Sequence, residues 1–336
     1  RNYEESQINR VIAEVRQPGS AFKPFVYTVG LNQGLTANSI IIDEPIHFGD
    51  YAPQNYDKKF RGPITLKKAL RESINVAAVK MGQQVGMDQV LNLAKSLGIT
   101  TLLPQDNNLA SAIGGLTQGV NLFELTTAYT VFANGGVLSQ PISILKVLDG
   151  NDQILEESRL VQQSIIRPEI AYIMTDILKS VIEDWDGTGT AANIGRQAAG
   201  KTGTTDNYET AWFVGYTPEL LVGIYVGNDD RKPVGISGAE VAGLWGKMMS
   251  NLLAGTKPTY FTVPPNIVTG IPICTKSGKL ATLGCPETEY SAFIRGTEPT
   301  AIDDHVRPQP KAAPQPNEQP EVRPRWKLPL PRLPNF

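Results

Sequence analysis

The period of the hydrophobic residues changes once along this chain, and that change constrains the fold more than any other feature. Apolar residues recur at three-to-four spacing over most of residues 65–184, which predicts a mainly helical region. The stretch ETAWFVGYTPELLVGIYVGND, residues 209–229, is rich in β-branched and aromatic residues and is split by Thr217-Pro218-Glu219, which predicts an antiparallel hairpin. The helical spacing returns at 238–255. The chain therefore combines a long helical region with antiparallel strands.

Glycine and proline mark where individual helices begin and end. A helix that starts near Ser20 should end near Gly34, and the helices over 65–86 and 87–98 should be separated at Gly86. Two more helices are predicted at 121–136 and 167–184. The second has Pro168 near its first turn, where proline is tolerated.

The composition excludes two classes of function. A net charge of −2 and a pI near 5.9 leave no basic field for nucleic acid, so no nucleic-acid partner is expected. No apolar run reaches the roughly 18 residues that a membrane span needs. With 336 residues, 41% of them hydrophobic, the chain is long enough for one large domain or two smaller ones. It opens RNYEES without an initiator Met, so we expect a longer precursor, with any membrane anchor outside this sequence.

Proline enrichment from residue 257 predicts a linker into a small C-terminal module that carries both cysteines. Cys274 and Cys285 are interpreted either as two buried thiols or as a disulfide, which would require an oxidising compartment. Because His47 and His305 are the only histidines, we expect no zinc site, and nothing in the chain calls for another metal or a cofactor. The tail, 305–336, holds nine of the 25 prolines and is expected to be extended or disordered.

The segment GRQAAGKTGTT has two interpretations. Gly195 and Gly200-Lys201-Thr202 satisfy G-x-x-x-x-G-K-[ST], the loop that binds nucleotide phosphates. That loop needs a buried strand before it and a helix after it, because the helix N-terminus and the loop amides hold the anion together. Here DWDGTGTAANI precedes without an apolar run, and GTTDNYETAWFVG follows with strand formers. The sequence therefore favours the other interpretation, a Lys-Thr-Gly strand of a serine acyl-transfer enzyme.

Acyl transfer needs a nucleophile, and Ser20-Ala21-Phe22-Lys23 supplies one with a lysine three positions on. On a helix these positions share a face, so the amine can approach the hydroxyl. Pro24 requires the helix to begin close to Ser20, which places the hydroxyl at the positive end of the helix dipole. The shortage of histidines indicates that the base is not histidine. A second match, Ser143-Ile144-Leu145-Lys146, lies in a predicted strand, where the two side chains would point to opposite faces.

Two further motifs raise the specificity of this interpretation. Ser73-Ile74-Asn75 is the only Ser-x-Asn of the chain, and Lys201-Thr202-Gly203 is the only Lys-Thr-Gly. Each alone has an ordinary structural explanation, a helix start for the first and a strand end for the second. The three motifs together, in the order Ser-x-x-Lys, Ser-x-Asn, Lys-Thr-Gly, are specific for a serine acyl-transfer enzyme.

These motifs and their surroundings resemble the transpeptidase domain of class A, bifunctional penicillin-binding proteins. The similar segments are RQPGSAFKPFVY, RESINVAAVK, ELTTAYTVFANGG, GKTGTTDNYETAWFVGY and TKSGKLATLGCPETEYSAFIRGTEPT, so the resemblance covers roughly residues 1–304. It implies an α+β fold, an antiparallel β-sheet flanked by helices plus a mainly helical subdomain at 65–184, as in serine β-lactamases. It also implies a transpeptidase domain at 1–256 and a small C-terminal extension at 257–304. A glycosyltransferase domain and a membrane anchor would precede them, at the extracytoplasmic face of the bacterial cytoplasmic membrane.

The resemblance also implies a mechanism without cofactors. Ser20 would attack the penultimate D-Ala carbonyl of a peptidoglycan stem peptide, forming an acyl-enzyme that an amine of a neighbouring stem peptide resolves. Lys23 would be the general base, made neutral by burial and by the nearby cation Lys201. Ser73 would relay a proton to the leaving amine. The same serine would be acylated by β-lactams.

Six residues would bind the substrate. Asn75, expected on an extended loop, would offer its amide to the substrate backbone. Gly203 would leave room for a peptide that pairs with an exposed strand edge, while the hydroxyls of Thr202 and Thr204, with Lys201, would hold the terminal carboxylate. The backbone N–H groups of Ser20 and Thr204 would form the oxyanion hole.

Two other functions stay open at this point. A β-lactamase or β-lactam sensor would share the fold, but no Glu-x-x-Leu-Asn segment lies between Ser73 and Lys201 to activate water, which favours a long-lived acyl-enzyme. A non-catalytic binding module is the other. Its best support is the tail KLPLPRLPNF, whose alternating prolines and leucines suit a partner groove, for instance on proteins of cell-wall synthesis or division.

Overall fold

The computed structural model of the chain describes residues 2–305. The predicted Pro-rich tail, from residue 306 onward, lies outside the described residues. At the centre is an antiparallel sheet of strand order β7-β8-β9, formed by β7 (Ala199–Thr204), β8 (Thr210–Tyr216) and β9 (Leu221–Gly227). The predicted hairpin over 209–229 is confirmed as β8 and β9. Lys201 pairs with Val214, so the Lys-Thr-Gly motif lies on β7 at one edge of the described sheet.

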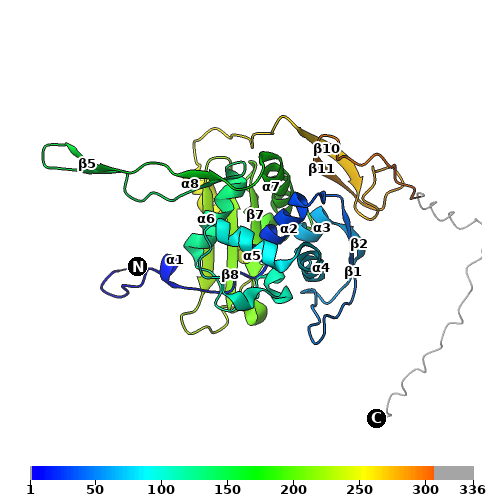
Figure 1. The fold of residues 1–336 in the computed structure, drawn as a ribbon, viewed down its shortest axis with the longest axis horizontal. Coiled ribbons are helices and arrows are strands. Elements are labelled where there is room, and N and C mark those ends of the chain that lie inside the picture. The colour runs from blue at the N-terminus through cyan, green and yellow to red at the C-terminus, as the bar shows by residue number, and fades with distance from the viewer. Residues whose placement is uncertain (1, 306–336) are drawn as a thin grey trace, which may run out of the picture.

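Helices cover both faces of this sheet, as expected for an α+β fold (Figure 1). Trp212, Val214 and Tyr216 belong to the larger core, which contains α2 (Lys23–Asn32), α6 (Leu122–Ala133) and α7 (Pro168–Glu183). Phe213, on the opposite face of β8, packs against Trp245 of α8 (Gly238–Leu252). Because β8 is buried on both faces, its sequence is apolar without strict alternation.

The segment 65–86 differs from its prediction as one helix. It forms α3 (Leu66–Arg71) and α4 (Asn75–Val85), and α5 (Met87–Ser96) follows after Gly86 as expected. Ser73 has φ 58°, and the N–H groups of Ser73 and Ile74 donate to the carbonyls of Leu70 and Ala69, at 3.1 and 2.8 Å. This is the Schellman ending of α3, with serine where glycine is usual. The Ser-x-Asn motif therefore occupies a sharp break between two helices.

Residues 137–164 are not helical, in contrast to the prediction for 65–184. Here β3 (Val137–Ser139) pairs with β6 (Gln162–Ser164), and β4 (Lys146–Leu148) pairs with β5 (Ile154–Glu157). The β4–β5 hairpin projects from the body of the molecule (Figure 1). Because its strands are exposed on both faces, they carry no burial pattern that a sequence period could reveal.

The remaining elements are short. Strands β1 (Ile40–Asp43) and β2 (Gly62–Thr65) pair antiparallel. Helix α1 covers Arg10–Ala13, and five 3₁₀ helices are η1 (Gly19–Phe22), η2 (Pro104–Asp106), η3 (Leu109–Ile113), η4 (Thr190–Ala192) and η5 (Asp206–Tyr208). Of these, η1 matters most for function because it carries Ser20.

The C-terminal module is built on β10 (Ile267–Cys274) and β11 (Thr288–Ile294), an antiparallel pair at the end of the molecule away from β5 (Figure 1). It contacts α3 through buried charges. Arg71 Nη1 lies 3.0 Å from Glu289 Oε2, and Lys67 Nζ donates to the carbonyl of Tyr290 at 2.6 Å. This ion pair and this hydrogen bond fix the module against the helix that leads into Ser73.

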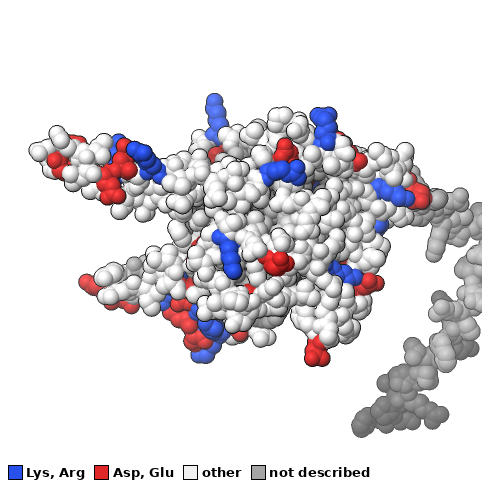
Figure 2. Space-filling model, in the orientation of Figure 1, with Lys and Arg blue, Asp and Glu red and all other residues white. Residues whose placement is uncertain are grey.

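The surface agrees with the near-neutral composition. On the face that Figure 2 shows, acidic and basic side chains are scattered in small groups, and neither sign forms a large patch. Between residues 2 and 305, no helix combines the length and the apolar character that crossing a bilayer requires.

Candidate active site

Ser20 lies in the turn that leads into α2. Gly19 has φ 51°, a conformation that favours glycine, and η1 begins there. The carbonyl of Ser20 accepts the backbone N–H of Lys23, where α2 begins with Pro24 in its first turn. In a 3₁₀ turn residues three apart eclipse one another, so Ser20 and Lys23 share one face. The expected helix start close to Ser20 is therefore present, as a 3₁₀ turn continued by α2.

Backbone contacts hold this turn against the sheet. A Cβ atom added to Gly19 would lie 2.5 Å from the carbonyl oxygen of Thr204, and one added to Gly114 would lie 2.1 Å from the carbonyl oxygen of Gly19. Only glycine permits such approaches, because any side chain would collide with backbone atoms that cannot move away. The turn that bears Ser20 is thus packed tightly between η3 and the end of β7.

Lys23, Ser73, Asn75 and Lys201 form one hydrogen-bonded group. Lys23 Nζ lies 2.6 Å from the carbonyl oxygen of Ser73 and 2.7 Å from Asn75 Oδ1. The hydroxyl oxygen of Ser73 is 3.3 Å from Lys23 Nζ and 2.9 Å from Lys201 Nζ. One serine hydroxyl therefore connects two buried amines from different parts of the chain. Within the described residues, the hydrogen bonds of Lys23 go to Ser73 and Asn75 rather than to the Ser20 hydroxyl.

Burial changes the proton affinity of both lysines, whose side chains are fully inaccessible to solvent. Desolvation, with a further contribution from the charge of Lys201, holds the pKa of Lys23 well below its usual range. Desolvation lowers the pKa of Lys201 to about 7. Both shifts favour the neutral amine at a lower pH than an exposed lysine would allow.

Asn55, which belongs to none of the sequence motifs, supports this group. Its Oδ1 accepts the backbone N–H groups of Asn75 and Val76 at 3.1 Å each, so a residue from a distant loop caps the N-terminus of α4. Its Nδ2 donates to both carboxylate oxygens of Asp43, at 2.8 and 3.0 Å. Asn55 and Asp43 are both buried, so a buried polar pair fixes the start of α4, directly after the break at Ser73.

The conformation expected for Asn75 is wrong. Asn75 opens α4 rather than lying on an extended loop, and its Nδ2 donates to the carbonyl of Gln54 at 2.9 Å, which leaves one amide hydrogen for a ligand. Gly203 is buried, and a Cβ atom added to it would lie 2.3 Å from the carbonyl oxygen of Pro18. Gly203 therefore makes room for the Ser20 turn on one face of β7, which is an edge strand of the described sheet.

The threonine hydroxyls of β7 lie on the side of α8. Thr202 Oγ1 is 3.2 Å from Lys201 Nζ and 2.8 Å from Thr188 Oγ1, while Thr204 Oγ1 accepts the backbone N–H of Gly238 at 2.9 Å. Thr202 thus shares the neighbourhood of Lys201. In this arrangement Thr204 bonds to the N-terminus of α8.

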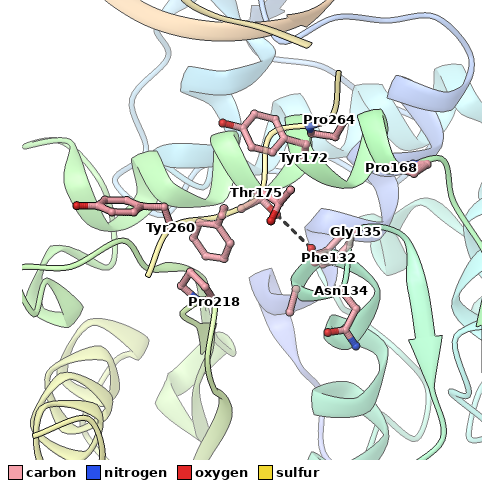
Figure 3. Close-up of a pocket in the computed structure, with 12 residues that line it drawn as sticks. Phe132, Asn134, Gly135, Pro168, Tyr172, Thr175, Pro218, Tyr260 and Pro264 are labelled. Carbon is pink, nitrogen blue, oxygen red and sulfur yellow. Dashed lines mark hydrogen bonds between the residues drawn. The ribbon is translucent and has the colours of Figure 1, made fainter. Parts of the chain in front are cut away.

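The described residues line a pocket close to this site and another one away from it. A polar pocket of about 240 Å³ is lined by Gln17, Thr205 and Thr210, which are near Ser20 or Thr204 along the chain, and by Thr117 from a distant segment, among others. A second pocket of about 320 Å³ lies between α6, α7 and residues 260–264, with Tyr260 and Tyr172 on its wall (Figure 3). It contains no predicted site residue, so its volume says nothing about the chemistry at Ser20.

Other candidate residues lie elsewhere. Ser143 and Lys146, the second Ser-x-x-Lys, are on the projecting β4–β5 arm, away from the other motifs. Cys274 and Cys285 are free thiols. No metal site was expected from the sequence, yet the structure brings these cysteines close to Asp303 and His305.

The chain matches two known families. Residues 1–241 match the profile of the penicillin binding protein transpeptidase domain, and residues 263–308 match the C-terminal domain of penicillin-binding protein 1A. It is 38% identical over 310 residues to penicillin-binding protein 1A of Aquifex aeolicus (strain VF5), covering 89% of this chain and 41% of that protein. For penicillin-binding protein 1A of Clostridium tetani the identity is 32% over 326 residues, covering 88% of this chain and 41% of that protein. The chain thus spans about two fifths of the length of these curated relatives.

A solved structure has the same fold. The crystal structure of penicillin-binding protein 1A from Haemophilus influenzae superposes with a TM-score of 0.80 at 28% identity, covering 90% of this chain and 51% of that one.

Proposed function

Because the chain belongs to the transpeptidase family of penicillin-binding proteins, we propose that it cross-links peptidoglycan stem peptides through an acyl-enzyme on Ser20. One observation carries this proposal: Lys23, which ends the turn that bears Ser20, and Lys201, both buried, meet at the hydroxyl of Ser73. The residues that we propose as base, proton relay and cation thus belong to one hydrogen-bonded group, and Lys23 is three residues from Ser20. The group needs neither metal nor cofactor for acyl transfer.

In the acylation step, Ser20 Oγ bonds to the penultimate D-Ala carbonyl carbon while its proton passes to the neutral amine of Lys23. The lowered pKa of Lys23 supports this role, because a protonated amine accepts nothing. The oxygen of the carbonyl becomes negative as the bond forms. We propose that the N–H groups of Ser20 and Thr204 stabilise it, each contributing about 3 kcal/mol as such donors typically do.

Collapse of the tetrahedral intermediate breaks the bond to the terminal D-Ala. The leaving amine needs a proton, and the hydroxyl of Ser73 is suited to deliver it because it contacts both amines, at 3.3 and 2.9 Å. An acceptor amine then attacks the ester by the reverse route, giving up its proton and restoring Ser20. Asn75, which bonds Lys23 through Oδ1, has one amide hydrogen left to orient the substrate backbone.

The substrate carboxylate, like that of penicillin, would be held by Lys201 and Thr202, whose Nζ and Oγ1 atoms are 3.2 Å apart. Lys201 titrates near neutrality in the unliganded site, and an incoming carboxylate favours its charged form. Gly203 and Thr204 contribute through the backbone that positions the Ser20 turn. This division of roles follows the contacts of β7, in which the Thr204 hydroxyl is bonded to α8.

For the chain as a whole we propose three parts. Residues 1–256 are the catalytic domain, residues 257–304 are an extension held by ion pairs to α3, and the tail from 305 is a site for proteins of cell-wall synthesis or division. We propose that the protein acts outside the cytoplasmic membrane of a bacterium, where its substrate lies, as part of a bifunctional enzyme with a glycosyltransferase domain. Stem peptides and β-lactams are its ligands.

Intact-mass spectrometry after incubation with a fluorescent penicillin tests the proposal. We expect one adduct per chain in the wild type and in Ser143→Ala, which removes the serine of the second Ser-x-x-Lys, and none in Ser20→Ala. An adduct that persists in Ser20→Ala would exclude Ser20 as the nucleophile. A steady release of hydrolysed penicillin at a high rate would instead indicate a β-lactamase.

A further inference from the structure

We propose that the C-terminal module holds a structural Zn²⁺ ion through Cys274, Cys285, Asp303 and His305. The Sγ atoms of the two cysteines and a carboxylate oxygen of Asp303 lie within 4.8 Å of one another. His305 Nδ1 joins them, 3.6 Å from Cys274 Sγ and 2.7 Å from Asp303 Oδ1. Four side chains of the types that bind zinc thus converge from three separate stretches of chain.

One separation suits a tetrahedral ion directly, whereas His305 Nδ1 and Asp303 Oδ1, 2.7 Å apart, are closer than the roughly 3.3 Å that two such ligands of one zinc ion keep. With Zn–S near 2.3 Å and Zn–N near 2.1 Å, a tetrahedral site separates sulfur and nitrogen by about 3.6 Å, the distance between Cys274 Sγ and His305 Nδ1. Cys285 Sγ lies 3.0 Å from Asp303 Oδ2, somewhat closer than the roughly 3.5 Å that two ligands of one zinc ion keep. A hydrogen bond from the Cys285 thiol to Asp303 Oδ2 accounts for this shorter distance. A side-chain shift of about half an ångström would admit the ion.

The ligand chemistry selects zinc among the common divalent ions. Two thiolates and an imidazole are soft or borderline donors, which bind Zn²⁺ well and Mg²⁺ or Ca²⁺ poorly. Asp303 has a fully buried side chain, and a carboxylate in that position is stabilised by a cation. Four protein ligands leave no open position, which is typical of structural rather than catalytic zinc.

Outer contacts already orient the ligands. Ser277 Oγ donates to Asp303 Oδ1 at 2.6 Å, and the backbone N–H of Thr282 points to Cys285 Sγ at 3.1 Å. Hydrogen bonds of this kind hold the ligands of metal sites in place and favour the anionic form of a sulfur. These contacts orient Asp303 and Cys285 as they would be oriented in a metal site.

The backbone brings the ligands together without help from the ion. Cys274 ends β10, and its carbonyl accepts the N–H of Gly278, which turns the chain back. Leu280 then bridges Ile273 on one side and Ile302 on the other, and its carbonyl accepts the N–H of Asp303 at 2.8 Å. Residues 301–305 are thereby aligned with the end of β10. The chain itself forms most of the cradle before the ion binds.

An ion here would fix the loop that touches the catalytic domain. The carbonyl of Gly278 accepts a hydrogen bond from Asn38 Nδ2 at 2.5 Å, and Lys276 Nζ donates to the carbonyl of Arg61 at 3.0 Å. Both loop residues lie between Cys274 and Cys285. Binding energy at the cysteines would therefore stabilise the attachment of the module as well as its fold.

The test uses the full chain, purified without metal and with its thiols reduced. Titration with Zn²⁺ should show one equivalent bound, with both cysteines protected from alkylation until a chelator is added. Co²⁺ in place of Zn²⁺ should give the absorption bands of a tetrahedral thiolate site. His305→Ala should weaken zinc binding at least about tenfold, whereas His47→Ala, at the other histidine, should not change it.

His305→Ala removes a ligand that a disulfide between the cysteines would not need, which separates the two explanations. Failure of the reduced, folded chain to bind one equivalent would overturn the proposal. So would equal zinc affinity in His305→Ala and wild type. A Cys274–Cys285 disulfide in the chain isolated from its native compartment, seen as a mass lower by two hydrogens and no bound metal, would overturn it as well.

Discussion

Replacing Asn55 with alanine tests whether a remote loop holds the break at Ser73. Asn55 is 4% exposed, and its side chain makes hydrogen bonds to Asp43, to the carbonyl of Lys59 and to the first N–H groups of α4. Alanine removes all of them and supplies no substitute. The change is far enough from Ser20 to leave the nucleophile itself intact.

The expected loss of stability follows from two terms. Loss of a helix cap typically costs about 1 kcal/mol. The buried carboxylate of Asp43 loses its side-chain donors and keeps the N–H of Arg61 at 2.9 Å, and leaving a buried polar group short of donors costs about 1–3 kcal/mol. We therefore expect the free energy of unfolding to fall by about 3 kcal/mol, which for a domain of this size lowers Tm by roughly 6 °C.

Activity should fall more than stability alone explains. Asn75 and Val76 lose the acceptor that fixes the start of α4, so Ser73 and Asn75 no longer keep their distances to Lys23. A displacement of about 1 Å in a catalytic group can cost on the order of a hundredfold in rate. We expect the second-order rate constant of penicillin acylation, measured by stopped-flow fluorescence well below Tm, to fall tenfold to a hundredfold by this reasoning.

The control is Asn151→Ala, at an exposed asparagine in the turn of the projecting arm, which should change stability by less than about 0.5 kcal/mol and leave acylation unchanged. If Asn55→Ala melts and reacts like wild type, Asn55 does not position the Ser73 segment. A loss of stability with an unchanged acylation rate would limit its role to folding.

Three further changes have defined outcomes. Because Lys201 has a pKa near 7 when folded and about 10.4 when unfolded, the unfolded chain binds more protons between these values. Wild type should thus gain stability over Lys201→Met by about 1.4 kcal/mol per pH unit above pH 7 in denaturant unfolding, and parallel pH profiles would contradict this. Gly114→Ala, with φ 81° and its Cβ 2.1 Å from the carbonyl oxygen of Gly19, should lower stability by more than about 1 kcal/mol and slow acylation; a wild-type Tm would refute the contact. Arg71→Ala leaves Glu289 buried without its partner and should cost about 3–5 kcal/mol in urea unfolding, whereas a loss below 1 kcal/mol would mean that water compensates the charge.

Elements with one clear period were predictable from the sequence. The hairpin of β8 and β9, the helix α8 and the helix α7 with Pro168 in its first turn all lie where the spacing of apolar residues puts them. In each of these elements the buried side chains follow the regular spacing of a helix or a strand, and that spacing can be read from a short stretch of sequence. Strands β4 and β5 are exposed on both faces, so their hydrophobic residues show no regular spacing from which strands could be predicted.

The sequence allowed the motifs of the site to be predicted, but not the positions of their side chains relative to one another. Local sequence does not reveal that Ser73 adopts a left-handed conformation, since serine at that position of a Schellman ending is uncommon. Nor does it reveal that Asn55 caps a helix 20 residues away, because that contact depends on how the loop folds back. The convergence of Asp303 and His305 on the cysteines has the same origin, the alignment of residues 301–305 beside Leu280. Contacts between distant segments are set by tertiary packing.

The most direct test of the account is a crystal structure of the chain after reaction with penicillin. The account predicts a covalent bond from Ser20 Oγ to the opened lactam carbonyl, with the penicillin carboxylate within hydrogen-bond distance of Lys201 and Ser73 still between the two lysines. Attachment to any other residue, or a carboxylate bound away from Lys201, would contradict it.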